Sequence, residues 1–365
     1  MTLIEKSEKY NYEVKLENDG AVKIFWSPHA NYFFNLKTGT MVSWGDHLED
    51  DPKEFPAPNI CDLECTTICT GIRGKVCPYC YKANTHTGKN MSFETFKHII
   101  DVFPKSLTQI AIGADATLKS NPDLWKMMEY ARKNNIVPNI TAVDIDDETA
   151  DKLVKYCGAV AISYHENADV CANSIKKLTD RGMAQVNMHL VIYEENYEEC
   201  LRLFKIIKED PRFAKLNAVV MLSLKQKGRA ATGYHILSQK HFKKLCNIAR
   251  SYKISIGFDS CSSLKAYNAF KNNSGIFNQI IPCESSIESS YINVEGKYYP
   301  CSFCEGEKTG DLDWTEGLNV LDCNSSEDFL DKIWNNPKTI QFKNALKSSA
   351  RCNGFNCREC PMFKI

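Results

Sequence analysis

The chain has 365 residues, and 45 Lys and Arg balance 45 Asp and Glu, so its formal net charge is zero. This balance provides no broad basic field of the kind that attracts nucleic acid or anionic lipid, although a local patch for nucleic acid stays open. No apolar run reaches the about 18 residues of a membrane span, and the charged N-terminal residues lack the apolar core of a secretory signal. We therefore expect a cytoplasmic protein with no membrane partner.

Seventeen cysteines are present. Without an export signal, so many cysteines indicate metal or redox chemistry and not a disulfide scaffold. They gather in two groups, five between Cys61 and Cys80 and seven between Cys283 and Cys360. The other five are scattered, and we expect four of them to be packing residues: Cys157, Cys171, Cys200 and Cys246.

Residues 1–58 are predicted to form a β-rich segment that ends in a linker. Alternating apolar residues flank Asn18-Asp19-Gly20, which is a strong hairpin signal, and the pattern repeats around Lys37-Thr38-Gly39. The acidic, proline-bearing residues 47–59 then indicate a connection to the next domain.

Residues 59–265 alternate between strand and helix patterns, which predicts an α/β domain with a parallel sheet. Helix starts are indicated at Ser92, Asn121 with Pro122, Asp146 and Ser238. Six or seven such repeats in about 200 residues suit a TIM-like barrel or partial barrel. The expected strands are Ile60–Thr66, Gln109–Ile112, Pro138–Val143, Ala159–Ser163, Gln185–Ile192, Ala218–Leu224 and Ser255–Phe258.

Residues 266–365 change pattern and predict a cysteine-rich α+β extension. A pair of short strands turns at Glu295-Gly296, between Cys283 and Cys301, with the spacing C-x12-G-x4-C. Two C-x2-C pairs follow, Cys301 with Cys304 and Cys357 with Cys360. Such pairs fit a four-cysteine zinc site as well as an iron–sulfur cluster.

The most informative motif is Cys69-x7-Cys77-x2-Cys80, directly after the first strand of the barrel. The glycines between Cys69 and Cys77 allow the chain to fold back, so the three thiolates can meet. Three thiolates are too few for a closed zinc site, which takes four ligands, but they suit an iron–sulfur cluster with one open iron. Cys61 and Cys65 lie earlier on the strand, and we expect both to be core residues.

This motif resembles the cluster loop of radical S-adenosylmethionine (radical SAM) enzymes, which has C-x3-C-x2-C with an aromatic residue before the last cysteine. Tyr79 occupies the aromatic place, whereas the first gap is seven residues instead of three. The resemblance implies a partial (β/α)6 barrel in which Cys69, Cys77 and Cys80 bind a 4Fe-4S cluster and S-adenosylmethionine (SAM). It implies reductive cleavage of SAM to a 5′-deoxyadenosyl radical that abstracts a hydrogen atom from a substrate.

The resemblance also suggests where SAM is held. Gly113, Ala114 and Asp115 follow the second strand of the barrel, where the family places a Gly-Gly-Glu-Pro segment that binds the SAM amino group. Ser163 ends the fourth strand, where the family often has a residue near the SAM ribose. An ordinary strand-to-helix turn at residues 113–115 is the alternative, and we assign no catalytic role to His165 or His189. The basic turn at residues 225–229 is either solvated or binds a carboxylate of SAM or substrate.

The C-terminal cysteines resemble the SPASM and twitch extensions of radical SAM enzymes, which hold auxiliary clusters. We expect one auxiliary 4Fe-4S cluster on Cys283, Cys301, Cys357 and Cys360, with Cys304 and Cys352 as reserves. Cys323 is expected in packing or at the surface. The role of Cys261, at the end of the last barrel strand, stays open between packing, cluster ligand and hydrogen-atom donor.

The expected function is that of a radical SAM enzyme, with a peptide or protein substrate favoured over a small molecule or nucleotide. An external one-electron donor such as flavodoxin or ferredoxin would be its redox partner. The alternative from another class is a non-enzymatic binding module that zinc stabilises through its C-x2-C pairs.

Overall fold

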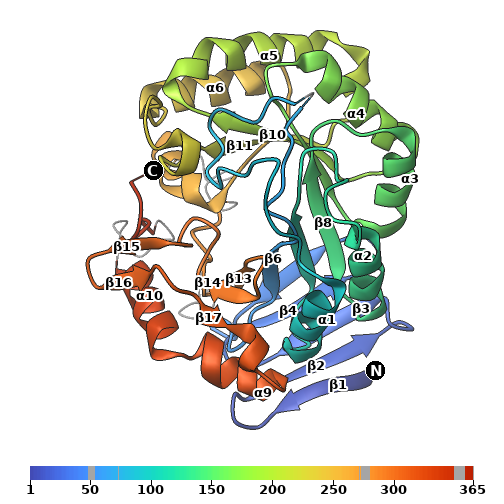
Figure 1. The fold of residues 1–365 in the computed structure, drawn as a ribbon, viewed down its shortest axis with the longest axis vertical. Helices are drawn as coiled ribbons and strands as arrows, with labels where there is room; N and C mark the ends of the chain where they lie inside the picture. The colour runs from blue at the N-terminus through green and yellow to red at the C-terminus, as the bar shows by residue number, and fades with distance from the viewer. Residues whose placement is uncertain (48–53, 73, 271, 273–279, 349–357, 365) are drawn as a thin grey trace.

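The computed structural model describes residues 1–47, 54–72, 74–270, 272, 280–348 and 358–364. Figure 1 shows an antiparallel sheet from the N-terminal segment lying against one end of a curved, mostly parallel sheet, with helices around the outside of the curve. Among the described residues, no helix is long and apolar enough to cross a membrane.

The N-terminal sheet has five antiparallel strands in chain order. Both predicted hairpins are confirmed, since β2 pairs with β3 and β4 with β5. Asn18, Asp19 and Gly20 all adopt positive φ at the first turn, a conformation that Asn, Asp and Gly tolerate best. The strands are β1 (Thr2–Ser7), β2 (Tyr12–Glu17), β3 (Val22–Trp26), β4 (Asn31–Asn35) and β5 (Met41–Trp44).

The inner face of this sheet packs on the end of the barrel where the barrel strands begin. Lys23 Nζ donates to the carbonyl of Leu107, 2.5 Å away, and Tyr32 donates its hydroxyl to the carbonyl of Ser106. Phe55, in the predicted linker, is buried in an edge-on contact with Phe25. The described part of that linker is therefore packed against the sheet instead of crossing solvent.

The main sheet has ten strands in the order β12-β11-β10-β9-β8-β7-β6-β13-β14-β17. Every pairing from β12 to β13 is parallel, so the predicted partial barrel is confirmed. Its strands are β6 (Ile60–Glu64), β7 (Gln109–Gly113), β8 (Val137–Ala142), β9 (Val160–Ser163), β10 (Val186–Ile192), β11 (Ala218–Ser223) and β12 (Ile256–Phe258).

Seven helices lie between or after these strands and bury one apolar stripe each. Three predicted starts are confirmed, because the cap side chain accepts a backbone N–H three residues on, at Ser92, Asp146 and Ser238. The helices are α1 (Phe93–Val102), α2 (Leu124–Lys133), α3 (Asp147–Tyr156), α4 (Ala168–Asp180), α5 (Tyr197–Glu209), α6 (Gln239–Ser251) and α7 (Ser263–Phe270).

The predicted cap at Asn121 is wrong. Helix α2 begins at Leu124, after Asp123, and the buried Asn121 amide donates to the carbonyls of Cys65, 2.7 Å away, and Met91, 3.0 Å away. The amide N–H groups therefore tie the chain after β6 to the chain before α1, while Oδ1 of the same side chain accepts the backbone N–H of Asp123, 2.9 Å away, just before the helix.

The C-terminal region continues the barrel sheet. Strand β13 (Ser289–Ile292) pairs in parallel with β6, and the predicted hairpin at Glu295-Gly296 is confirmed by its antiparallel pairing with β14 (Lys297–Tyr299). The remaining elements are β15 (Glu307–Thr309), β16 (Leu312–Trp314), β17 (Leu318–Asn319), α9 (Ser326–Phe329), the π-helical η7 (Leu330–Trp334) and α10 (Pro337–Ser348).

Five 3-10 helices complete the described chain: η2 (Glu194–Asn196), η3 (Pro211–Phe213), η4 (Gly228–Ala230), η5 (Ser260–Ser262) and η6 (Val320–Asp322). Two of them, η4 and η5, lie beyond the carboxyl ends of β11 and β12. They bring the side chains that follow these strands to the same end of the barrel as the cysteines after β6.

Candidate metal and cofactor centre

The loop after β6, residues 65–92, is here called the cysteine loop. Its thiols at Cys69, Cys77 and Cys80 are half-buried, whereas those of Cys61 and Cys65 are buried in the core. Burial raises the pKa of Cys65 beyond the usual range of a thiol and that of Cys61 to about 12, as expected of packing residues. The three motif cysteines therefore differ in environment from the two that precede them.

The chain folds back between Cys69 and Cys77, as the two glycines predicted. Gly71 has a φ of +68°, and Ile72 and Lys75 exchange two backbone hydrogen bonds of 3.0 Å. The backbone N–H of Cys69 donates to the carbonyl of Thr85, 2.6 Å away, which holds the first cysteine against the returning strand of the loop.

The three thiols of the motif are electrostatic neighbours. Burial, together with the nearby Cys80 and Cys69, raises the pKa of Cys77 to about 12, because neighbouring thiolates repel one another. A positively charged metal centre would remove both penalties by stabilising the thiolates.

One of these sulfurs accepts a backbone hydrogen bond, and a histidine ring lies against another. The backbone N–H of Gly71 donates to Cys69 Sγ, 3.4 Å away. The ring nitrogens of His165, which follows β9, lie 3.4 and 3.6 Å from Cys77 Sγ, and Tyr79 Oη lies 2.8 Å from His165 Nδ1. His165 had no predicted role, because a lone histidine without a ligand spacing carries no local signal.

The basic turn after β11 clamps the cysteine loop. Arg229 donates from Nε to the carbonyl of Cys77, 2.7 Å away, and from its guanidinium to the carbonyl of Asn84, 3.0 Å away. Its backbone N–H donates to the carbonyl of Cys80, also at 3.0 Å. A Cβ at Gly228 would lie 2.2 Å from the carbonyl oxygen of Tyr81, so the turn approaches the loop closely.

The other cations of this turn also bond to the protein. Lys225 Nζ lies 2.5 Å from the Asp259 carboxylate in a buried ion pair, and Lys227 Nζ donates to the carbonyl of Phe303, 2.9 Å away. The alternative that the turn is solvated is therefore wrong, and binding of a ligand carboxylate stays a prediction. It joins the cysteine loop to the C-terminal region.

The predicted SAM-binding segment lies beside the cysteine loop. Gly113 ends β7, and its carbonyl accepts the backbone N–H of Cys65 at 2.9 Å. Asp115 is only 2% exposed, and its carboxylate accepts hydrogen bonds from the backbone N–H groups of Thr117, at 3.1 Å, and Ser120, at 3.0 Å. The acidic group is thus used by its own turn, and the Gly113 carbonyl is used by the chain after β6.

The remaining predicted positions lie on β9 and β10. Ser163 ends β9, half-buried and in register with His189 of β10. His189 Nδ1 lies 3.3 Å from Thr141 Oγ1, and burial lowers the pKa of His189 to about 4. Whether Tyr79, Gly113, Ala114, Asp115 and Ser163 contact SAM stays a prediction.

The C-terminal cysteines form a second group. Cys301 Sγ lies 3.4 Å from Cys304 Sγ, and Cys283 and Cys360 are electrostatic neighbours of Cys301. The hydrogen bond from Cys304, with help from the Lys225 charge, lowers the pKa of Cys301 to about 7. Arg358 donates to the carbonyl of Cys283, 3.0 Å away, and so ties the tail to this group.

Two cysteines that the sequence left undecided lie in this second group. Cys304, considered only a reserve ligand, is fully buried beside Cys301. Cys261, in η5, is close enough to Cys283 and Cys301 for their charges to raise its pKa, although burial is the larger cause. Cys323 is buried away in the core, while Cys352 and the expected ligand Cys357 lie outside the described residues.

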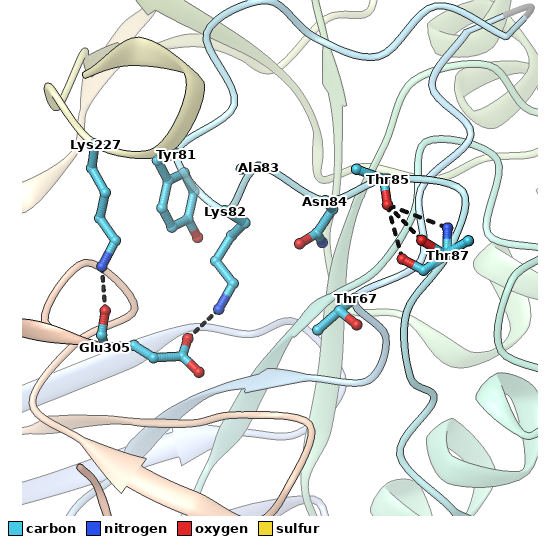
Figure 2. A pocket seen from close by; sticks show the side chains of 9 residues that line it. All are labelled: Thr67, Tyr81, Lys82, Ala83, Asn84, Thr85, Thr87, Lys227 and Glu305. Carbon is cyan, nitrogen blue, oxygen red and sulfur yellow. Dashed lines mark hydrogen bonds and ion pairs between the residues drawn. The ribbon is translucent and has the colours of Figure 1, made fainter. Parts of the chain in front are cut away.

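A polar pocket of about 360 Å³ separates the cysteine loop from the C-terminal region. Figure 2 shows Lys82 and Lys227 reaching towards Glu305 from one side of the pocket. Lys82 pairs with Glu305 and also with the buried Glu64, 3.1 Å away. The other lining residues are Thr67, Tyr81, Ala83, Asn84, Thr85 and Thr87.

The donor set of the cysteine loop fits an iron–sulfur cluster. Within the described ranges, no three His, Cys, Asp or Glu side chains are placed to hold a single metal ion. A mononuclear site needs each sulfur about 2.3 Å from one point, whereas a multi-iron cluster holds its thiolates further apart. Half-buried thiols, one of which accepts a backbone N–H···S hydrogen bond, are typical surroundings of such clusters.

Comparison with known proteins defines the fold class. No protein-family model matches the chain, and no curated protein sequence matches it. In structure, the central domain has the partial barrel of radical SAM enzymes, with the additional antiparallel sheet at the N-terminus.

The particular structures that it resembles include two of Streptococcus suis SuiB. SuiB bound to S-adenosylmethionine has a TM-score of 0.64 at 11% identity, over 93% of each chain. SuiB bound to the precursor peptide SuiA has a TM-score of 0.57 at 14% identity, over 78% of this chain and 66% of that chain. BtrN in complex with AdoMet and 2-DOIA aligns with a TM-score of 0.38 at 14% identity, over 80% of this chain and 87% of that chain.

Proposed function

We propose that this protein is a radical SAM enzyme whose Cys69, Cys77 and Cys80 bind a 4Fe-4S cluster. The observation that carries the proposal is the position of these three half-buried thiols: one loop, at the carboxyl end of a central barrel strand, in a fold shared with SAM-bound SuiB. When bound, the cluster and SAM supply a 5′-deoxyadenosyl radical that takes a hydrogen atom from the substrate.

The protein's own contribution is to hold the loop and exclude water. Arg229 fixes the carbonyls of Cys77 and Asn84, on both sides of Cys80, and the backbone N–H of Gly71 stabilises thiolate charge at Cys69. For SAM itself, the backbone at the end of β7, from Gly113 to Ala114, is the candidate in place of the Asp115 carboxylate, which its turn already uses.

An auxiliary 4Fe-4S cluster on the C-terminal cysteines belongs to the same proposal. Cys283, Cys301 and Cys360 are neighbours, which supports three of the four expected ligands. Cys304 beside Cys301 and Cys261 beside Cys283 now compete with Cys357 for the fourth place. A SPASM- or twitch-like role for this region stays part of the proposal.

A peptide or protein is the proposed substrate, with a small molecule or nucleotide as the rival. Support comes from SuiB, which was crystallised with a precursor peptide, and from the polar pocket, whose paired lysines and acids offer hydrogen bonds to an extended chain. The redox partner would be a one-electron donor such as flavodoxin or ferredoxin.

The test is anaerobic purification followed by iron and sulfide counts and a SAM-cleavage assay with dithionite. We expect about eight irons per chain, falling to about four in Cys69→Ala/Cys77→Ala/Cys80→Ala, together with loss of 5′-deoxyadenosine formation. Cys323→Ala, which changes a buried core thiol, serves as the control and should retain both. Zinc in place of iron, without SAM cleavage, would overturn the enzyme and leave a zinc-stabilised binding module.

A further inference from the structure

The turn after β11 carries three cations, and two of them are paired with acids. Lys225 Nζ lies 2.5 Å from the Asp259 carboxylate, and Lys227 Nζ lies 3.0 Å from the carboxylate of Glu307. The third cation, Arg229 in η4, donates from its side chain to backbone carbonyl oxygens instead. A carbonyl satisfies an N–H group but carries no net charge, so these bonds do not neutralise the guanidinium.

The positive charge of Arg229 is therefore uncompensated. In the part of the chain that the structure describes, no carboxylate lies within ion-pair distance of this guanidinium. An arginine side chain stays protonated, and this one is half-buried, so that water screens its charge only in part. A fixed positive charge thus lies at the carboxyl end of the barrel strands.

This charge is held against the cysteine loop. Arg229 Nε lies 2.7 Å from the carbonyl oxygen of Cys77, and its backbone N–H donates to the carbonyl of Cys80 at 3.0 Å. The close approach needs Gly228, where a Cβ would lie 2.2 Å from the carbonyl oxygen of Tyr81. The Arg229 charge also lowers the pKa of Cys77, against the larger effects of burial and of the neighbouring thiols.

We propose that Arg229 is the counter-charge of the SAM-binding cluster, in addition to holding its loop. The inference rests on the proposed function. Three thiolate ligands bring negative charge to the cluster site and reduction adds more, so a fixed cation beside the loop stabilises the reduced form most. Arg229 is a positioning residue, because it acts through the backbone of Cys77 and Cys80 and through its charge.

The test separates the charge of Arg229 from its hydrogen bonds. Arg229→Gln keeps side-chain N–H donors and loses the charge, whereas Arg229→Lys keeps the charge and loses the fork of donors. The reduction potential is measured without SAM in the reconstituted proteins by electron paramagnetic resonance, and the spectral change on adding SAM identifies the SAM-binding cluster. We expect Arg229→Gln to weaken reduction about tenfold, or about 59 mV for one electron, and Arg229→Lys to stay close to the wild-type potential.

Lys227→Met is the matched control. It removes a cation of the same turn that Glu307 already neutralises, so its potential should shift clearly less than that of Arg229→Gln. An iron-loaded Arg229→Gln protein with the wild-type potential would overturn this inference and leave the proposed function intact, even if its affinity for SAM falls. Equal shifts in Arg229→Gln and Arg229→Lys would also overturn it, because the hydrogen bonds and not the charge would then set the potential.

If Arg229→Gln takes up no iron, Arg229→Lys decides. An iron-loaded Arg229→Lys protein at the wild-type potential supports the role of the charge, and a lowered potential contradicts it. A wild type that binds no iron would overturn both this inference and the proposed function.

Discussion

Asp115 shows how a residue can match the position of a ligand-binding acid and instead stabilise the turn in which it lies. Its position after β7 corresponds to the acidic residue that holds SAM in the family the motif resembles. In the structure one of its carboxylate oxygens accepts hydrogen bonds from Thr117 and the other accepts one from Ser120, and the side chain is buried. A carboxylate so occupied has little capacity left for a ligand.

Replacing Asp115 should therefore lower the stability of the fold more than it lowers the affinity for SAM. We expect Asp115→Ala to lower the free energy of unfolding by about 1–3 kcal/mol, because the buried N–H groups of Thr117 and Ser120 lose their acceptor. Thr117→Val removes only one hydroxyl bond and should cost less. Denaturant unfolding measures both, and anaerobic calorimetry measures SAM affinity. An Asp115→Ala protein of full stability that no longer binds SAM would reverse this assignment.

At the scale of the element, the cysteine loop shows how a seven-residue gap can replace a shorter one. The extra residues form a small turn closed by Ile72 and Lys75, which projects from the loop and leaves Cys69 beside the strand at Thr85. The turn depends on Gly71, whose added Cβ would lie 2.0 Å from the carbonyl oxygen of Lys75. Part of the longer gap is thus taken up by this turn.

The two glycines of this turn provide a matched pair of variants. Gly71 and Gly74 both have positive φ, +68° and +79°, but a Cβ at Gly74 would meet nothing within 4 Å. Gly74→Ala should cost only the about 1–2 kcal/mol of a left-handed alanine and keep its iron. Gly71→Ala must open the turn and should lose iron from the SAM-binding cluster. Iron counts after reconstitution check this, and equal iron in the two variants would contradict it.

At the scale of the whole molecule, one sheet runs through both cysteine regions. Strand β13 pairs with β6, and β14, which leads to Cys301, pairs with β13 on its other side. Lys82, with Glu64 and Glu305, and Lys227, with the carbonyl of Phe303, then link the two loops. The N-terminal sheet closes the opposite end of the barrel through Lys23 and Tyr32.

The buried Lys23 should make stability depend on pH. Burial lowers its pKa from the ordinary 10.5 to about 7. Between pH 7 and 10.5 the unfolded chain therefore holds one proton more than the folded chain, and the free energy of unfolding rises with pH by up to about 1.4 kcal/mol per unit. Denaturant unfolding from pH 7 to 9 measures the slope. Lys23→Met should remove this contribution, and an identical slope in the variant would refute it.

Local pattern was sufficient for most of the fold. The hairpin at Asn18-Asp19-Gly20, the alternation of strands and helices, the cap at Ser92 and the glycine fold-back after Cys69 all depend on residues within a few positions of one another. Asn121 was mispredicted because its partners, at Cys65 and Met91, lie in other segments. The packed Phe55 was missed for the same reason.

The sequence by itself determined the partial barrel and the cysteine motif, because hydrophobic periodicity and cysteine spacing depend on residues that are close together in the chain. Only the tertiary structure brought His165 to Cys77, 88 residues away, and Arg229 to the same residue, 152 residues away. It also placed Cys261 beside the C-terminal cysteines. Parallel strands bring their carboxyl ends to one edge of the sheet, so side chains that share no local pattern meet there.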